Sequence, residues 1–164
     1  MNRLLACLVA LIMLFVATRP AAAGSSTNTL EQALRELAAE TDRRWDARDA
    51  QGLSALFATD ATLQIAGRET VVLRDAIEIY FQKSFSAMSD DLRHVTRIVR
   101  WQALAPDLVL TDNDVRLERL LPSGERILVR QFINHTIAVK DGTGWRLKAS
   151  RAHVRPAEAG GGAS

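Results

Sequence analysis

The sequence has few residues that cross-link a chain or hold a metal. It has 164 residues and one cysteine, Cys7, so it can form neither an internal disulfide bond nor a four-cysteine zinc site. It contains no glycine-rich phosphate loop, no G-x-S-x-G nucleophile motif and no H-E-x-x-H zinc motif. The three histidines, His94, His135 and His153, show no tight ligand spacing. We therefore expect no metal and no cofactor.

An apolar run opens the chain. Arg3 precedes the unbroken apolar run Leu4–Ala17, and small residues follow up to Gly24. This order is typical of a secretory signal peptide, and the run is shorter than the roughly 20 residues that a membrane span needs. We predict a signal peptide over residues 1–23 and a periplasmic or secreted protein with no stable membrane anchor after cleavage. The alternative is an uncleaved N-terminal anchor.

Cleavage would change the charge balance. The whole chain has 21 basic and 19 acidic residues, and residues 1–23 contain Arg3, Arg19 and no acid. The mature chain would therefore have 19 basic (21 − 2) and 19 acidic residues, and it would lose Cys7. A neutral balance removes the main argument for nucleic-acid binding. The remaining length suits one domain held together by its apolar core.

The periodicity of the mature chain changes from helix to strand. We expect a linker over residues 24–28, with Asn28 capping a helix that runs from Leu30 to about Gly52. Apolar or packing residues form a stripe on one face of this helix, at Leu30, Leu34, Leu37, Ala38, Thr41 and Trp45. Further helices are predicted at 53–57 and 75–88, a short strand at 61–65, and long strands at 92–104, 108–121, 125–140 and 145–154. Helices followed by an antiparallel meander indicate an α+β domain over residues 29–155, before a flexible tail at 156–164.

The alternation of the long strands predicts which side chains share the concave face. With a three-residue turn at 122–124, that face would carry a few polar groups on an apolar wall, which describes a small-molecule pocket. These groups are Asn113, Gln131, His135, Arg151 and His153, with His94 and Thr96 from the preceding strand. A one-residue change of register would move them to the other face.

Several motifs carry a family resemblance. They are Trp45…Asp49, the segment 52–63 (GLSALFATDATL), Arg74-Asp-Ala-Ile77, His94-Val-Thr96 and Gly144-Trp-Arg-Leu147. In this order they resemble the nuclear transport factor 2-like superfamily, and most closely its SnoaL-like branch of unknown function, which includes proteins labelled SgcJ/EcaC. The resemblance implies a cone-shaped, cystatin-like fold: three N-terminal helices on a strongly curved, mostly antiparallel sheet, with a pocket at the open end. It also implies a homodimer through the outer sheet face.

The superfamily hosts several chemistries, so the site residues must decide between them. Ile65 occupies the position that the resemblance assigns to the base of ketosteroid isomerases, which argues against that reaction. Asp112, Asp114 and Arg116 could form the arrangement of limonene-type epoxide hydrolases, but we expect them on the outer face.

A dehydratase similar to scytalone dehydratase would use strand histidines with a helix carboxylate. His94 and His135 would be its acid–base pair.

We therefore expect an exported small-molecule-binding protein with acid–base activity of the isomerase, cyclase or dehydratase type. His94 and His135 would exchange protons with the ligand. The ligand-binding residues would be Trp45, Asn113, Gln131, Arg151 and His153. The alternative is a non-catalytic ligand-binding or dimeric assembly module. A cavity of roughly 300 Å³ or more with both histidines on its wall favours the ligand site, and a cone plugged by aromatic side chains such as Trp45 favours the module.

Overall fold

The computed structural model describes residues 23–155. Apart from Ala23, the predicted signal peptide lies outside the described residues, as does the predicted tail at 156–164, so both remain predictions. The elements in chain order are α1 (Ala23–Asp46), α2 (Ala50–Ser54), β1 (Phe57–Ile65), β2 (Val71–Val72), α3 (Arg74–Ser86), β3 (Leu92–Ala105), β4 (Leu108–Leu120), β5 (Arg126–Asp141) and β6 (Gly144–Val154). None of the helices in this range is long and apolar enough to cross a membrane.

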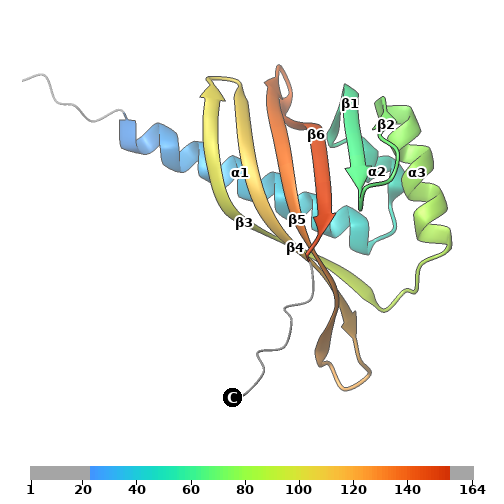
Figure 1. Cartoon of the computed structure of the whole chain (residues 1–164). Helices are drawn as coiled ribbons and strands as arrows, with labels where there is room; N and C mark the ends of the chain where they lie inside the picture. The colour runs from blue at the N-terminus through green and yellow to red at the C-terminus, as the bar shows by residue number, and fades with distance from the viewer. Residues whose placement is uncertain (1–22, 156–164) are drawn as a thin grey trace, which may run out of the picture.

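One curved sheet and three helices make up the domain. The six strands lie in the order β2-β1-β6-β5-β4-β3, and every neighbouring pair is antiparallel except β1 with β6. α1 runs along one face of the sheet, while α2 and α3 lie at its β1–β2 end (Figure 1). The predicted α+β class, with three helices on a mostly antiparallel sheet, is confirmed.

α1 presents the predicted apolar stripe to the sheet. Leu34 and Trp45 are buried, and the opposite side carries the ion pair between Arg35 and Glu31. The predicted start of this helix was wrong, because α1 begins at Ala23 and residues 24–28 are helical. That stretch contains no proline to stop a helix. Asn28 therefore lies inside the helix instead of capping it.

The segment after α1 also differs from the prediction. Asp49 caps α2, since its side chain accepts a hydrogen bond from the Gly52 N–H, and this places the short helix at 50–54 instead of 53–57. β1 therefore starts at Phe57. β2 has two residues, which is too few for a period to appear in the sequence.

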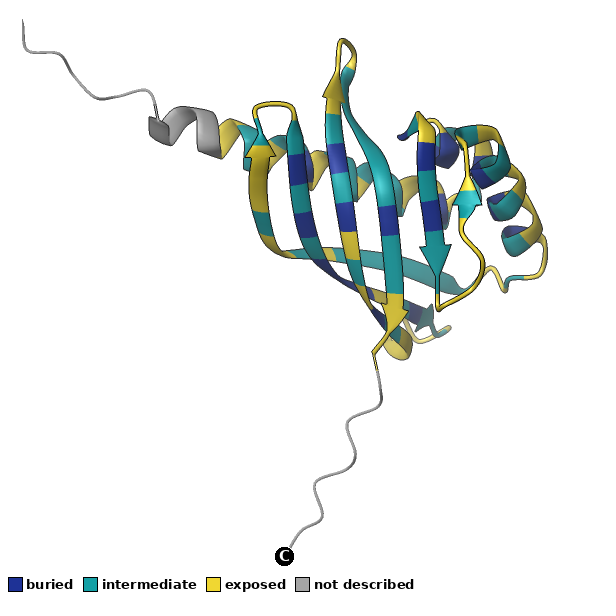
Figure 2. Ribbon diagram, turned by 45° about the horizontal axis from the view of Figure 1, so that its top comes forward, coloured by how far each residue is buried: buried dark blue, intermediate teal, exposed yellow. Residues whose placement is uncertain are grey.

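Most of the buried apolar side chains form two clusters on the helix side of the sheet. The first joins the end of α1, α2, α3 and β1, with Trp45, Leu53, Phe57, Ile77 and Phe81 among its members. The second lies beneath the middle of α1 and consists of Leu34, Val109 and Ala138, with partly buried neighbours that include Trp101 and Trp145. Figure 2 shows buried bands on the long strands and on the inner sides of the helices.

A bulge between β4 and β5 changes which side chains face α1. Near the turn the pairing follows the prediction, with Glu118 opposite Leu128. An extra residue at Val129 then shifts the register, so that Asn113 lies opposite Asn134 instead of Ile133. Asn113 lies on the inner face, as the sequence predicts. On β5, however, the inner face beyond the bulge carries even-numbered residues such as Asn134 and Thr136.

A second bulge lies in β6 at Lys148. Leu147 pairs with Ala138, but beyond the bulge Ser150 pairs with Thr136. Ser150 therefore faces the pocket. The residues predicted to face it from these two strands lie on the outer face instead; they are Gln131, His135, Arg151 and His153.

Candidate functional site

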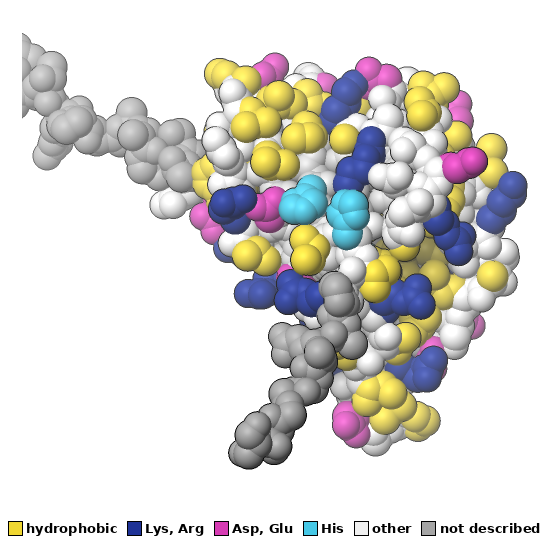
Figure 3. All heavy atoms as spheres, in the orientation of Figure 1, with side chains coloured by type: hydrophobic (Ala, Val, Ile, Leu, Met, Phe, Trp, Pro, Cys, Tyr) yellow, Lys and Arg dark blue, Asp and Glu magenta, His cyan; other side chains and the backbone are white. Residues whose placement is uncertain are grey.

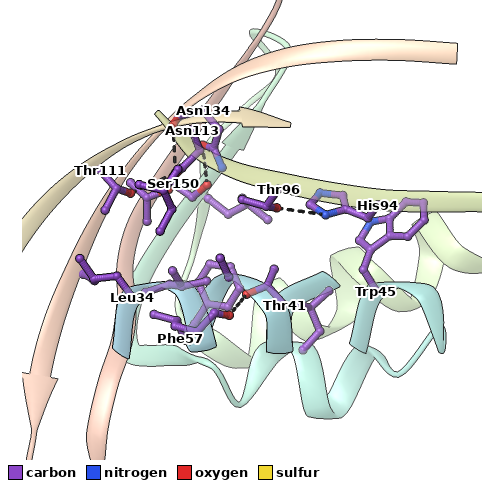
Figure 4. A pocket seen from close by; sticks show the side chains of 18 of the residues that line it. Leu34, Thr41, Trp45, Phe57, His94, Thr96, Thr111, Asn113, Asn134 and Ser150 are labelled. Atoms are coloured by element: carbon purple, nitrogen blue, oxygen red, sulfur yellow. Dashed lines mark hydrogen bonds between the residues drawn. The ribbon is translucent and has the colours of Figure 1, made fainter. Parts of the chain in front are cut away.

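A cavity of about 120 Å³ lies between α1, α2–α3 and the concave face of the sheet. Its apolar walls come from both core clusters and include Leu34, Trp45, Leu53, Phe57, Leu63, Ile65, Phe81, Ile98, Ala138 and Leu147. Its polar lining residues are Thr41, His94, Thr96, Thr111, Asn113, Asn134, Thr136 and Ser150 (Figure 4). The cavity is smaller than the roughly 300 Å³ set above as favouring a ligand site, and His94 lines it while His135 does not.

His94 is held by a carboxylate of helix α1. Its Nδ1 lies 2.6 Å from Asp42 Oδ1. The same carboxylate accepts hydrogen bonds from Thr96, at 2.7 Å from Oγ1 and 2.9 Å from the backbone N–H. The His94 side chain is 15% exposed and that of Asp42 21%, so the contact is well shielded from water.

This contact selects the tautomer of His94. An ionised carboxylate only accepts hydrogen bonds, so Nδ1 carries the proton in the neutral ring. Nε2 then presents a lone pair, and no described residue hydrogen-bonds it. The arrangement of a carboxylate that orients an imidazole is the one that hydrolytic enzymes use to prepare a general base.

The backbone around His94 is fixed as well. Asp46, one helical turn after Asp42, accepts the His94 backbone N–H at 2.8 Å. Trp45 packs on the His94 ring, with ring centroids 5.2 Å apart. Arg48 lies over Trp45 at 4.4 Å and donates to the Ser89 carbonyl at 2.7 Å. Burial is the main cause that lowers the pKa of Arg48.

A second polar group lies on the sheet side of the cavity. Asn113 Nδ2 donates to Thr111 Oγ1 at 3.0 Å and to the Asn134 carbonyl at 3.2 Å, and Thr136 Oγ1 is 3.3 Å away. Ser150 donates to Asn134 Oδ1 at 3.0 Å. In Figure 4 this amide–hydroxyl cluster and His94 lie at separate ends of the pocket.

The hydrogen bonds also orient the Asn113 amide. A backbone carbonyl only accepts, so the Asn113 atom next to the Asn134 carbonyl must be the NH₂ group. This leaves Asn113 Oδ1 and Asn134 Nδ2 without a partner in the part of the chain that the structure describes. The cluster therefore offers a ligand one acceptor and one donor.

Three of the predicted site residues, His94, Trp45 and Asn113, line the cavity. The other four do not, because of the two bulges. On the outer face, His135 contacts Asp112 at 2.8 Å, and Gln131 donates to Asp114. Arg151 donates to Thr62 Oγ1 at 2.9 Å. The hypothesis of a His94–His135 pair across the pocket is wrong.

Sequence reasoning missed several pocket residues. Asn134, Thr136 and Ser150 were hidden by the bulges, which leave no mark in the alternation. Asp42 did have a signal, since it lies beside Thr41 on the predicted inner stripe and four residues before Asp46. Ile65 lines the cavity, so the position that the resemblance gives to the base of ketosteroid isomerases has no proton acceptor.

No protein-family model matches the chain, and no curated protein matches it in sequence. Solved structures match it in fold. A nuclear transport factor 2-like protein with a cystatin-like fold from Novosphingobium aromaticivorans is 22% identical, with a TM-score of 0.71 over 87% of this chain and 94% of that one.

Two further structures show the same fold. A ketosteroid isomerase-like protein from Erwinia carotovora atroseptica is 13% identical, with a TM-score of 0.60 over 75% of this chain and 94% of that one. A protein from Catenulispora acidiphila, solved in complex with S-DNPA, is 12% identical, with a TM-score of 0.65 over 77% of this chain and 94% of that one. The chain thus has the cystatin-like fold of nuclear transport factor 2-like proteins, as the sequence motifs predict.

Proposed function

We propose that the protein is exported, binds a small neutral molecule in this cavity and acts on it by acid–base chemistry at His94. The observation that carries the proposal is the Asp42–His94 contact, which directs a prepared imidazole into an apolar pocket. The relative solved with a bound small molecule shows that this fold can take a ligand.

The size and lining of the cavity define the ligand class. An apolar cavity of roughly 150 Å³ accommodates benzene, so about 120 Å³ suits a molecule of one ring or a short branched chain. Apart from His94, no titratable side chain lines the cavity in the described part of the chain. An ionised ligand would be buried there without a counter-charge, at a cost of several kcal/mol. The ligand is therefore neutral and mostly apolar.

The cluster around Asn113 and the His94 side chain would have different roles toward such a ligand. The amide–hydroxyl cluster around Asn113 would bind a carbonyl or hydroxyl group of the ligand. His94 Nε2 would take a proton from a neighbouring carbon, and Asp42 would stabilise the imidazolium that forms. Returning the proton to another carbon gives an isomerisation, and giving it to a departing hydroxyl gives a dehydration. One histidine serves as both base and acid, since His135 lies outside the pocket.

Proton exchange tests this proposal without knowledge of the natural substrate. Cyclohexanone, a neutral one-ring ketone, is incubated with the protein in D₂O, and loss of its α-C–H signals is followed by NMR. We expect the wild type to accelerate the exchange and His94→Gln to lose roughly 10²-fold or more of that acceleration. The matched control is His135→Gln, which makes the same change on the outer face and should exchange like the wild type.

Two results would contradict the proposal. One is equal exchange by His94→Gln and the wild type. The other is equal loss in both histidine variants, since His135 has no contact with the cavity.

A non-catalytic module is the second candidate function, and one observation favours it. The cavity is smaller than the volume that would favour a ligand site, and Trp45, Phe57 and Phe81 take up part of the cone as wall residues. Under this alternative, a panel of neutral one-ring compounds would leave the melting temperature unchanged. A dimer formed through the outer face would still appear in sedimentation. Stabilisation by any such compound, lost on Leu34→Trp, would support the ligand site instead.

A further inference from the structure

A separate group of titratable side chains lies on the outer face of the sheet. His135 on β5 and His153 on β6 are both exposed, and their ring centroids are 6.1 Å apart. In Figure 3, histidine side chains lie side by side on the face of the sheet away from α1. Asp112 on β4 approaches His135 from the other side, with Oδ1 2.8 Å from Nδ1. The proposed pocket chemistry uses none of these groups.

We propose that His135 and His153 form a binding site for a divalent late transition-metal ion such as Zn²⁺ or Cu²⁺. Two imidazoles that bind one tetrahedral Zn²⁺ through nitrogens at 2.0–2.1 Å have ring centroids about 5 Å apart. The observed 6.1 Å exceeds this by about one ångström. Both side chains are exposed, so a small rotation about their side-chain torsions closes the gap without moving the strands.

Asp112 is placed to hydrogen-bond a histidine ligand, as carboxylates behind the ligands of metal sites do. A ligating histidine commonly donates its second ring N–H to a carboxylate, which fixes the tautomer and makes the ligating nitrogen more basic. Asp112 accepts from Nδ1 of His135, so Nε2 is the nitrogen left for the metal.

Neighbouring arginines do not block the site. Arg100 Nη2 pairs with Asp112 at 2.7 Å, and Arg151, opposite His135 in the register, donates to Thr62 Oγ1 at 2.9 Å. Each guanidinium is therefore engaged by its own acceptor. The described residues contain no group of three or more histidine, cysteine and acidic side chains placed to hold a metal. The remaining coordination positions would be open to water or to a donor from another molecule.

Titration of the tag-free protein with Cu²⁺ tests the proposal, followed by calorimetry and by electron paramagnetic resonance, which reports nitrogen ligands. We expect saturable binding of one ion per chain with two nitrogen donors. His135→Ala and His153→Ala should each weaken it at least about tenfold, and Asp112→Ala about tenfold. His94→Gln removes a histidine elsewhere and should bind like the wild type.

The stoichiometry and the variants decide the outcome. One ion per two chains, together with a faster-sedimenting species that EDTA dissociates, would also support the site, with a second copy supplying the other ligands. Equal affinity of the wild type and both outer-face histidine variants would overturn the proposal, as would a nitrogen signal that only His94→Gln removes.

Discussion

His94 owes its position to two aspartates one turn apart on α1. Asp42 accepts hydrogen bonds from His94 Nδ1 and from the Thr96 backbone N–H. Asp46 accepts one from the His94 backbone N–H. The same residues thus attach α1 to the beginning of β3 and orient the proposed base. Under the proposed function, stability and catalysis would be coupled at this point, since a loose helix would leave the imidazole without a fixed direction.

Replacing Asp42 with alanine should therefore destabilise the fold. The change removes the acceptor of three hydrogen bonds at partly buried donors, and each unsatisfied donor costs about 1–3 kcal/mol when water cannot replace the partner. Because water can reach part of the site, we expect a total loss of about 2 kcal/mol in urea unfolding. Glu36→Ala, on the exposed side of α1, is the control and should change stability by less than about 0.5 kcal/mol. Equal stability of the two variants would show that Asp42 does not hold α1 to β3.

At the scale of the elements, α2 depends on one glycine. The Gly52 N–H donates to Asp49 Oδ1 at 2.8 Å. This hydrogen bond is the main cause that lowers the Asp49 pKa, and the Arg44 contact comes second. A Cβ at Gly52 would lie 2.1 Å from Asp49 Oδ2 and 2.8 Å from Arg44 Cδ. The helix can therefore keep its cap only while residue 52 has no side chain.

Gly52→Ala should accordingly displace the cap, although alanine is normally the better helix former. Loss of an N-cap and local overpacking each cost about 1–2 kcal/mol, and we expect a decrease of that size in the free energy of unfolding. Gly142→Ala is the matched control, because a Cβ there meets nothing within 4 Å. A Gly52→Ala protein as stable as the control would mean that Asp49 finds another rotamer without loss.

The two bulges are the features of the strands that could not be predicted from the sequence. The α+β class, the order of the three helices and the four long strands followed from periodicity and turn residues, although α1 and α2 begin earlier than predicted. Asn113 was placed on the correct face. Bulges at Val129 and Lys148 add one residue to a strand without changing its composition, so no alternation pattern reveals them. For this reason the sequence placed His135, Arg151 and His153 on the wrong face of the sheet. About half of the predicted site residues were therefore wrong.

At the scale of the whole molecule, the sheet separates two kinds of polar chemistry. The concave face carries neutral amides and hydroxyls with one oriented histidine. The convex face carries ion pairs such as Asp112 with Arg100, and the exposed histidine pair. The two proposed functions lie on opposite faces, so we expect substitutions to remove one without the other. Substitutions at His94 and His135 are therefore controls for each other in the two proposed experiments.

The ion pairs of the convex face predict how stability responds to acid. Hydrogen bonds from His135 and then Arg100 lower the pKa of Asp112 below its usual value. A carboxyl whose pKa is lower in the folded state contributes stability above its unfolded pKa of about 4, and that contribution is lost as the pH falls further. We therefore expect stability to drop below about pH 4, with proton uptake on unfolding reduced in Asp112→Asn. Urea unfolding between pH 7 and pH 2.5 measures the slope, and Asp107→Asn, which makes the same charge change in the exposed β3–β4 turn, is the control. An Asp112→Asn protein whose stability falls as steeply as that of the control would place the acid sensitivity elsewhere in the fold.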